Sequence, residues 1–339
     1  MKIDILCGSG SPDGVSLQDL HGDNGRVGVG GSEYALLTLC EGWAGVGHEV
    51  TVYNNARKQN DKFQQRRGNE FEKKTDRDVV IFFREPTPKV TGVSGLKVFW
   101  SCDQHTTGDF RQFSQFVDKV VTISPFHSRY FAQRYEIRQP IHIDLPIRSW
   151  EYEKETEKVP NRLIFTSVPD RGLDVVLKTF NKIRDVLPDA SLVITSDYRL
   201  WGVESARNDS YVMSFKDERN VQFLGAVPRS RLVEEQMKAQ IHYYPCTYEE
   251  LFCIAVAESQ VAGVLPITTP KGALESTNMG VIINGDAKDP AVQKAFVDKT
   301  LEYLHNPDLP RIQNELKKKA IERFSLSEIM AEWEEKVFN

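Results

Sequence analysis

Short runs of β-branched and aromatic residues alternate with helix-length segments through most of the chain. The N-terminal runs are residues 2–7, 49–53, 78–83, 96–100 and 119–124, and the pattern starts again after residue 150 with 162–168, 191–195 and the runs VQFLG, QIHYYP and VLPITT. Consecutive parallel strands need a crossover segment, usually a helix, so strands that alternate with helices form parallel sheets. The alternation therefore predicts an α/β fold, built twice, with helices on both faces of each sheet.

The point at which the pattern restarts suggests a domain boundary. A length of 339 residues suits about two domains. Residues 151–160 (EYEKETEKVP) are charged, end in proline and lack a periodic apolar face, which is typical of a linker. No sequence repeat relates the two halves, so we expect two domains that share an architecture. Ligands bind at the carboxyl ends of strands in such sheets, and we expect the active site in the cleft between the domains.

Charge and cysteine content exclude some classes of protein. Lys and Arg number 43 against 48 Asp and Glu, giving a net charge of −5, which disfavours a general polyanion-binding surface. Residues 57–74 are locally basic, but interleaved acids favour a solvated loop or insertion over an anionic-partner patch. Five scattered cysteines without a Cys-x-x-Cys pair indicate a reducing compartment and no zinc site. With no signal peptide or apolar run of about 18 residues, we expect a cytoplasmic protein.

A glycine-rich segment precedes the first predicted helix. Residues 25–33 read GRVGVGGSE, and Ser32 is the predicted helix cap. Backbone without Cβ allows a ligand to approach closely, although a surface loop would look the same. Gly8, Gly10 and Gly14 lack the spacing of a dinucleotide-binding loop, and the strand 49–53 is followed by Asn-Asn rather than an acid, so nicotinamide chemistry is disfavoured.

Two glutamates are the strongest local feature of the second half. Glu250 and Glu258 are separated by seven residues across an apolar run. Eight residues of helix rise about 12 Å, comparable with the distance from the hexose to the ribose of a nucleotide sugar. The two carboxylates could therefore bind hydroxyls at opposite ends of one donor, with its diphosphate near the helix N-terminus. The alternative is that Glu250 caps the helix and Glu258 is solvated.

Three other polar segments are candidates for chemistry. Arg171 follows a predicted strand and precedes a helix, where a guanidinium suits paired phosphate oxygens, although it could be a surface arginine. Asp103 and His105 follow the strand 96–100 on its expected ligand side, although a loop histidine needs no function. Asp76-Arg77-Asp78 could be an Asp-x-Asp metal motif, but its position suits a polar lead-in to the next strand better. Metal-ligand spacing is also absent among His127, His142, His242 and His305.

A signature in the second half is formed by Pro245, Cys246, Glu250, Phe252, Cys253 and Glu258. It resembles the Pro-Ser-x-x-Glu-x-Phe-Gly…Glu-Ala signature of the retaining glycosyltransferases of family 4, which have the GT-B fold of two Rossmann-like domains facing each other across a cleft. Other stretches also match that family in order, so the resemblance covers most of the chain: GGSEYALLTLCEGWAGVGHEVTVY, RGLDVVLKTF…LPDASLVI, VQFLGAVPRSRLVEEQMKAQIHYYP and ERFSLSEIMAEWEEKVF.

The chain departs from the family pattern at four places. Ser167 stands where the family usually has an arginine, and Arg171-Gly172 replaces its Lys-Gly pair. The sequence DLPIRSW replaces the common Asn-Gly turn at the domain junction, and Cys253 replaces a glycine. Neutralisation of a diphosphate would therefore depend more heavily on Arg171.

The resemblance implies a division of labour between two domains. Residues 1–149, with a final helix 325–339 packing back on them, would form the acceptor-side domain, and residues 150–324 the donor domain. Glu250 would hold the sugar hydroxyls, Glu258 the ribose and Arg171 the diphosphate, with Asp103 or His105 close to the donor sugar. Backbone contacts with the donor would come from Gly30, Gly31, Leu251, Phe252, Cys253, Gly272 and Ala273.

The implied reaction moves a sugar from a UDP- or GDP-sugar to an acceptor hydroxyl, with retention at the anomeric carbon and no metal or other cofactor. The acceptor stays open between glycan, lipid, protein and modified nucleic acid, and peripheral membrane contact stays open too. Hinges near 148–160 and 323–326 would let donor binding protect residues 25–31. A nucleotide-sugar epimerase of the same architecture and a catalytically silent binding module are the competing hypotheses.

Overall fold

The computed structural model describes residues 1–8, 13–21, 28–106, 108–201 and 218–339. The chain divides into two compact units. The N-terminal unit comprises Met1–Leu20, Gly30–Ile147 and Phe324–Asn339, and the C-terminal unit comprises His21–Val29 and Arg148–Arg323. The chain thus passes from one unit to the other at Leu20–His21, Val29–Gly30, Ile147–Arg148 and Arg323–Phe324.

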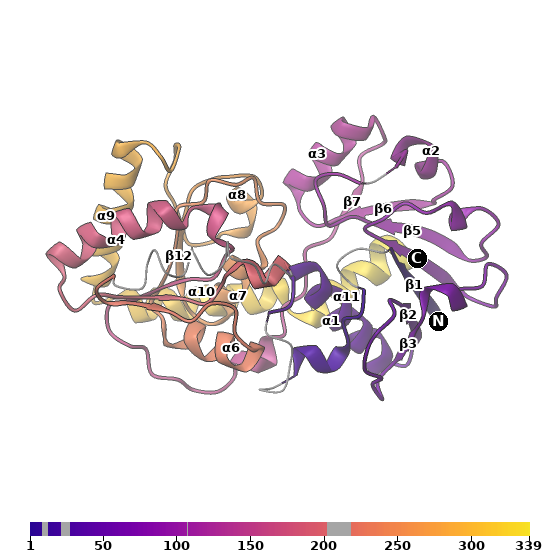
Figure 1. The fold of residues 1–339 in the computed structure, drawn as a ribbon, viewed down its shortest axis with the longest axis horizontal. Helices are drawn as coiled ribbons and strands as arrows, with labels where there is room; N and C mark the ends of the chain where they lie inside the picture. The colour runs from indigo at the N-terminus through magenta and orange to yellow at the C-terminus, as the bar shows by residue number, and fades with distance from the viewer. Residues whose placement is uncertain (9–12, 22–27, 107, 202–217) are drawn as a thin grey trace. The chain divides into compact units, whose positions relative to one another are not determined.

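The N-terminal unit is built on a wholly parallel sheet (Figure 1). The strand order is β3-β2-β1-β4-β5-β6-β7. The strands are β1 (Lys2–Cys7), β2 (Glu49–Tyr53), β3 (Gln64–Arg66), β4 (Val79–Phe83), β5 (Leu96–Trp100), β6 (Lys119–Thr122) and β7 (Ile141–His142). The sheet turns back at β1, which pairs with β2 on one side and β4 on the other.

Two helical layers cover this sheet because its central strands are apolar on both faces. On one face lie α2 (Phe110–Ser114) and α3 (Pro125–Tyr135), which pack their phenylalanines against Phe82 and Phe99. On the other face lie α1 (Gly31–Gly45) and α11 (Leu326–Trp333), which run side by side in Figure 1. Adjacent strand residues point to opposite faces, so Trp100 contacts Trp333 whereas Phe99 contacts Phe131.

The C-terminal end of the chain is held in the N-terminal unit by an aromatic cluster. Trp333 meets Trp43 edge-on at 5.4 Å between ring centroids and Trp100 at 5.3 Å. Phe338, at the end of the helical turn Glu334–Phe338, completes the cluster. At Phe324, where the chain re-enters the N-terminal unit, the backbone carbonyl accepts a hydrogen bond from the Ile147 amide at 2.8 Å. Residues 324–339 are therefore an integral part of this unit.

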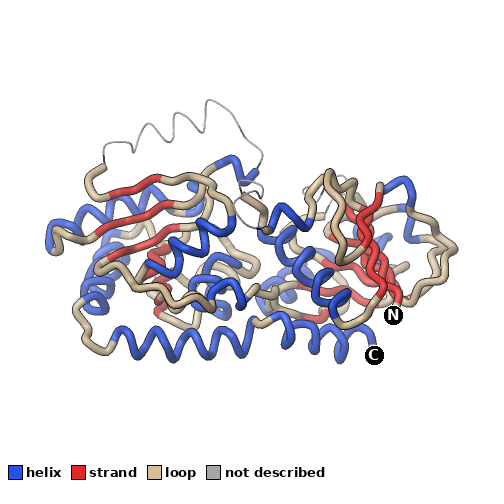
Figure 2. Tube along the Cα trace, turned by 90° about the horizontal axis from the view of Figure 1, so that it is seen from below, coloured by secondary structure: helices blue, strands red, loops and turns tan. Residues whose placement is uncertain are grey.

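The C-terminal unit repeats the architecture with a second parallel sheet, in the order β10-β9-β8-β11-β12-β13. The strands are β8 (Arg162–Phe165), β9 (Ser191–Ile194), β10 (Val221–Phe223), β11 (Ile241–Tyr244), β12 (Leu265–Thr268) and β13 (Val281–Ile282). The helices are α4 (Leu173–Val186), α6 (Arg229–Lys238), α7 (Ile254–Val261), α8 (Leu274–Thr277), α9 (Pro290–Leu304) and α10 (Leu309–Phe324). Figure 2 shows the strands of each unit as a layer with helices on either side.

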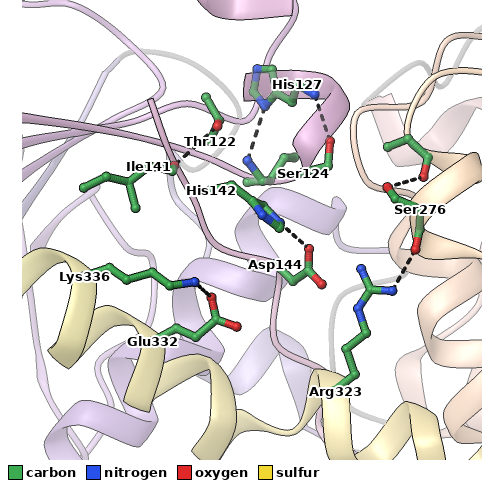
Figure 3. Close-up of polar contacts among 12 residues, drawn as sticks. Thr122, Ser124, His127, Ile141, His142, Asp144, Ser276, Arg323, Glu332 and Lys336 are labelled. Atoms are coloured by element: carbon green, nitrogen blue, oxygen red, sulfur yellow. Dashed lines mark hydrogen bonds and ion pairs between the residues drawn. The ribbon is translucent and has the colours of Figure 1, made fainter. Parts of the chain in front are cut away.

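The helices α4 and α9 pack together over one face of this second sheet. Their apolar side chains, among them Val176, Phe180 and Phe296, form one core with Phe165 and Tyr243 of the sheet. At the end of α10, the Arg323 guanidinium donates to the Ser276 carbonyl at 2.7 Å (Figure 3). None of the helices in the described ranges combines the length and hydrophobicity that crossing a bilayer requires.

Two local predictions are wrong. The N-cap of α1 is Gly30, in an extended conformation and without a side-chain cap, so Ser32 lies inside the first helical turn. Residues 57–74 are not simply a solvated loop, because they supply the edge strand β3 and bury Phe63 and Phe71. Phe71 meets Tyr53 edge-on at 5.2 Å and lies beneath the Arg77 guanidinium. Isolated apolar residues in a polar segment thus anchor it to the sheet.

We expect Trp333→Ala to destabilise the N-terminal unit by about 3–5 kcal/mol, because truncating a fully buried aromatic side chain leaves a cavity. Trp333 is 1% exposed. Phe116→Ala in the same unit is the control, since Phe116 is 42% exposed and its loss should cost under about 1 kcal/mol. Denaturant unfolding monitored by far-UV circular dichroism measures both. Equal losses for the two variants would contradict the anchoring role of residues 324–339.

Candidate active site

Arg171 and Glu250 lie at the point where the second sheet reverses its strand order. The chain goes from β8 outward to β9 and β10, and then returns to β11 on the other side of β8. Arg171 follows β8 in the 3₁₀ turn Pro169–Arg171, and Glu250 follows β11. Loops that leave the carboxyl ends of strands at such a reversal diverge and leave a crevice, which is where open α/β sheets bind ligands.

The two side chains form a short ion pair. Nη1 of Arg171 donates to Oε1 and Oε2 of Glu250 at 2.7 and 2.9 Å. The Tyr244 hydroxyl donates to the same Oε1 at 2.6 Å, and the Tyr248 ring lies 4.5 Å from the guanidinium carbon of Arg171. The Glu250 side chain is 5% exposed, whereas that of Arg171 is 28% exposed. The buried carboxylate therefore orients an arginine that solvent and ligands can reach.

Electrostatics fixes the protonation states around this pair. Burial alone would lower the pKa of Arg171, but its interactions with Glu250, Tyr244 and Cys253 together more than offset this, so the pKa is raised and the guanidinium stays charged. Burial, with the charge of Glu250, raises the pKa of the Cys246 thiol to about 12 and that of Cys253 well above its usual value. Both thiols are therefore neutral at physiological pH and neither is an activated nucleophile.

Close backbone packing holds the loops around the ion pair. Gly172 has φ +120°, and a Cβ there would lie 2.4 Å from the Pro245 carbonyl oxygen. Gly272 has φ +61°, and a Cβ there would lie 2.3 Å from the carbonyl oxygen of Glu250. The Ala273 amide donates to that carbonyl at 2.7 Å. The loop of Lys271–Ala273 thus fixes the backbone of Glu250, as only glycine at position 272 permits.

The helix that carries Glu258 begins later than the Glu-x7-Glu spacing predicts. The first residue of α7 is Ile254, so Glu250 lies in the preceding loop and the two glutamates do not share one helix. Glu250 is not the helix cap either, because the N-cap is Cys253 with no side-chain hydrogen bond. Cys253 has φ +71°, a left-handed conformation that favours the glycine of the signature it resembles. Leu251 and Phe252, just before it, are buried.

Glu258 is buried and paired rather than solvated. Its side chain is 5% exposed, and Oε1 lies 2.6 Å from Nη1 of Arg229, the first residue of α6. Burial raises the pKa of Glu258, and the Arg229 charge acts in the opposite direction. Arg229 was not predicted from the sequence, because nothing in its spacing to Glu258 indicates the contact.

The predicted residues of the N-terminal unit gather at the reversal point of the first sheet, beyond β1, β4 and β5. Asp103 accepts hydrogen bonds from Nε and Nη2 of Arg84 at 2.6 and 2.7 Å. Nη1 of Arg84 donates to Glu33 of α1 at 2.9 Å. Arg84, which the sequence analysis also missed, has φ +67°, uncommon for a residue with a side chain. Gly30 and Gly31 begin α1 next to Glu33.

His105 and Asp103 have different surroundings. His105 is exposed, with its ring 6.3 Å from that of Tyr130. The Asp103 carbonyl instead accepts from Nε2 of the buried His127 at 3.1 Å, while Nδ1 accepts from the Ile123 amide at 3.4 Å. Ser124 caps α3 beside His127 (Figure 3). His127, rather than His105, therefore supports the loop that carries Asp103.

Other predicted features have structural partners or lie outside the described residues. Arg77 is buried and donates to Asp4 at 2.7 Å, and the Asp78 carboxylate accepts from the Lys2 amide at 2.6 Å, as expected of a polar lead-in to a strand. The described residues contain no group of three or more His, Cys, Asp and Glu side chains placed to hold a metal ion. Gly10 and residues 25–27 of the glycine-rich segment lie outside the described residues.

A known protein family matches the part of the chain that contains Arg171 and Glu250. The family described as glycosyl transferases group 1 matches residues 150–323, which include Arg171, Arg229, Glu250 and Glu258. The chain belongs to this family. Membership classes it with the sugar-transferring enzymes, and the resemblance at the Glu250 signature is confirmed at that level.

Relatives and solved structures agree with the family. A stretch of 160 residues is 22% identical to a phosphatidylinositol N-acetylglucosaminyltransferase subunit of Arabidopsis thaliana, covering 47% of this chain and 34% of that protein. The chain thus matches only about a third of the length of that curated relative.

Two solved structures resemble nearly the whole chain. A glycosyltransferase from Rickettsia africae has a TM-score of 0.74 at 14% identity, covering 99% of this chain and 97% of that one. HepE of Anabaena, solved in complex with UDP and glucose, has a TM-score of 0.69 at 13% identity, covering 99% of both chains. These similarities confirm the GT-B fold of two Rossmann-like, parallel-sheet domains.

The buried His127 should make stability depend on pH. Burial lowers its pKa from 6.5 to about 4, so the folded state resists a proton that the unfolded chain accepts. Stability is therefore complete above pH 6.5 and falls as the pH drops towards 4. Between pH 7 and pH 5 the wild type should lose about 2 kcal/mol more than His127→Gln. Denaturant titrations at both pH values measure this.

The exposed His105 supplies the control for this titration. His105→Gln should follow the wild-type pH dependence, because it leaves the buried His127 unchanged. If His127→Gln and the wild type lose the same free energy of unfolding, then His127 does not carry the effect.

Proposed function

We propose that the chain transfers a sugar from a nucleoside-diphosphate donor to an acceptor hydroxyl, with retention at the anomeric carbon and without a metal ion. The observation that carries this proposal is the Arg171–Glu250 pair at the strand-order reversal of the C-terminal unit. An oriented, partly exposed guanidinium beside an uncapped helix start is suited to a diphosphate leaving group.

In this mechanism Arg171 and the backbone amides at the start of α7 stabilise the negative charge that develops on the departing diphosphate. Donors fixed before the reaction contribute most, because they need no reorganisation as charge develops. Tyr244 and Arg171 hold the Glu250 carboxylate in place, where it would accept hydrogen bonds from the donor sugar. The neutral thiols of Cys246 and Cys253 make a cysteine-linked intermediate unfavourable, which supports attack by the acceptor on the face that the diphosphate leaves.

A UDP-sugar is the favoured donor, ahead of a GDP-sugar, because HepE was solved with UDP and glucose and the fold is shared along the whole chain. A thermal-shift screen with UDP-, GDP-, ADP- and dTDP-sugars tests this directly. A ligand at 100 times its Kd stabilises the folded state by about 2.7 kcal/mol. A shift with UDP-sugars alone is expected. No shift with any of the four would overturn the proposal.

A transferase is favoured over an epimerase because of how Glu250 is held. An epimerase needs acid and base groups free to exchange protons at the sugar ring. Glu250 is instead committed to an arginine and a tyrosine. Incorporation of solvent deuterium into the nucleotide sugar would favour the epimerase.

The two glutamates should separate nucleotide binding from turnover. Glu258→Ala should weaken binding of UDP by about 10- to 150-fold, because ribose hydroxyls would lose a charged acceptor worth about 1.5–3 kcal/mol. Glu250→Ala should leave UDP affinity within about threefold and reduce sugar transfer. Isothermal titration with UDP and a transfer assay measure the two effects. Unchanged UDP affinity in Glu258→Ala would refute the ribose assignment.

Activity should not need a divalent cation, since Arg171 and the helix amides would supply the positive charge. We expect UDP binding and donor turnover to be the same in EDTA and in Mn²⁺. Loss of activity in EDTA that Mn²⁺ restores would contradict the metal-independent mechanism.

A further inference from the structure

A row of alternating charges in the C-terminal unit runs from Arg148 to Glu258. Nε of Arg148 donates to Oε1 of Glu151 at 2.7 Å, and Oε2 of Glu151 accepts from Nε of Arg229 at 2.5 Å. Nη1 of Arg229 then lies 2.6 Å from Oε1 of Glu258. Arg148 directly precedes the 3₁₀ turn Ser149–Tyr152, which carries Glu151. Arg229 lies in α6 and Glu258 in α7.

This row is unlike the ion pairs on the protein surface. The Arg229 side chain is 10% exposed and that of Glu258 5%, so each charge has lost most of its water. A buried charge of this kind needs its partner, because the partner supplies what water no longer can. Arg229 uses separate nitrogens for its two carboxylates, so its orientation is fixed from both sides.

We propose that Arg229 is a positioning residue for nucleotide binding, which holds the Glu258 carboxylate in place and in its ionised form. The inference rests on the proposed function, in which Glu258 accepts hydrogen bonds from the ribose. Arg229 itself is assigned no contact with the nucleotide. Its effect on binding passes through Glu258.

The charges around Glu258 give the effect a direction. Burial raises the pKa of Glu258, Arg229 lowers it, Glu151 raises it and Gln236 lowers it. Arg229 is the largest of the influences that lower this pKa, so without it the carboxyl group takes up a proton at a higher pH. A protonated carboxyl is a weaker acceptor for two ribose hydroxyls. Loss of Arg229 should therefore weaken nucleotide binding most at low pH.

The test measures the Kd for UDP between pH 6 and pH 8. The Kd of each variant is divided by the wild-type Kd at the same pH, which cancels the effect of ionisation of the nucleotide phosphate. For Arg229→Met we expect this ratio to be at least about tenfold larger at pH 6 than at pH 8. Arg229→Lys keeps the charge and should give a nearly flat ratio. Arg231→Met is the matched control, because Arg231 is on the same helix but pairs with Glu234 and Glu235.

A double variant separates positioning from general damage. In Glu258→Gln, the Arg229→Met substitution should produce no further pH dependence, because no carboxyl remains to titrate. A pH-independent ratio for Arg229→Met, or a pH-dependent one that survives in the double variant, would overturn the positioning role alone. Failure of the wild type to bind UDP, GDP or ADP would overturn the proposed function and this inference together.

Discussion

The ion pair between Arg171 and Glu250 is the contact on which the proposed site depends. Each partner lies in the loop that follows a different strand of one sheet, and the two loops meet because the sheet reverses its order between β8 and β11. Gly172 and Gly272 allow the flanking loops to approach closely enough for it to form. The arginine faces solvent only in part because a buried carboxylate and Tyr248 hold it. The strand order, the loop packing and the charge of Glu250 thus together hold the Arg171 guanidinium in place.

The architecture was readable from the sequence because it depends on local patterns. The runs at 2–7, 49–53 and 96–100 match the strands β1, β2 and β5, since parallel strands covered on both faces are largely apolar. Helix termini were less predictable. Ser32 is a good N-cap by residue type, yet the helix already begins at Gly31, with Gly30 as its N-cap. Glu250 and Glu258 do not share a helix because α7 begins only at Ile254.

Only some residues of the candidate site could be predicted from the sequence, and the reason differs from that for the helix termini. Arg171 and Glu250 stand next to recognisable strand ends, so their positions could be inferred. The partners of Glu258 and Asp103 could not be inferred, because Arg229, Arg84 and His127 reach these two residues across long sequence separations. Each of these partners supports a polar group at a strand end or in a buried helix, and burial makes such partners obligatory. Tertiary packing, not spacing, selected them.

The most direct test of the account is a crystal structure of the full chain with a bound nucleoside-diphosphate sugar. The account predicts diphosphate oxygens within hydrogen-bond distance of the Arg171 guanidinium and of the backbone amides at the start of α7, with ribose hydroxyls at Glu258. A donor bound away from Arg171, or a diphosphate held through a metal ion instead, would contradict it.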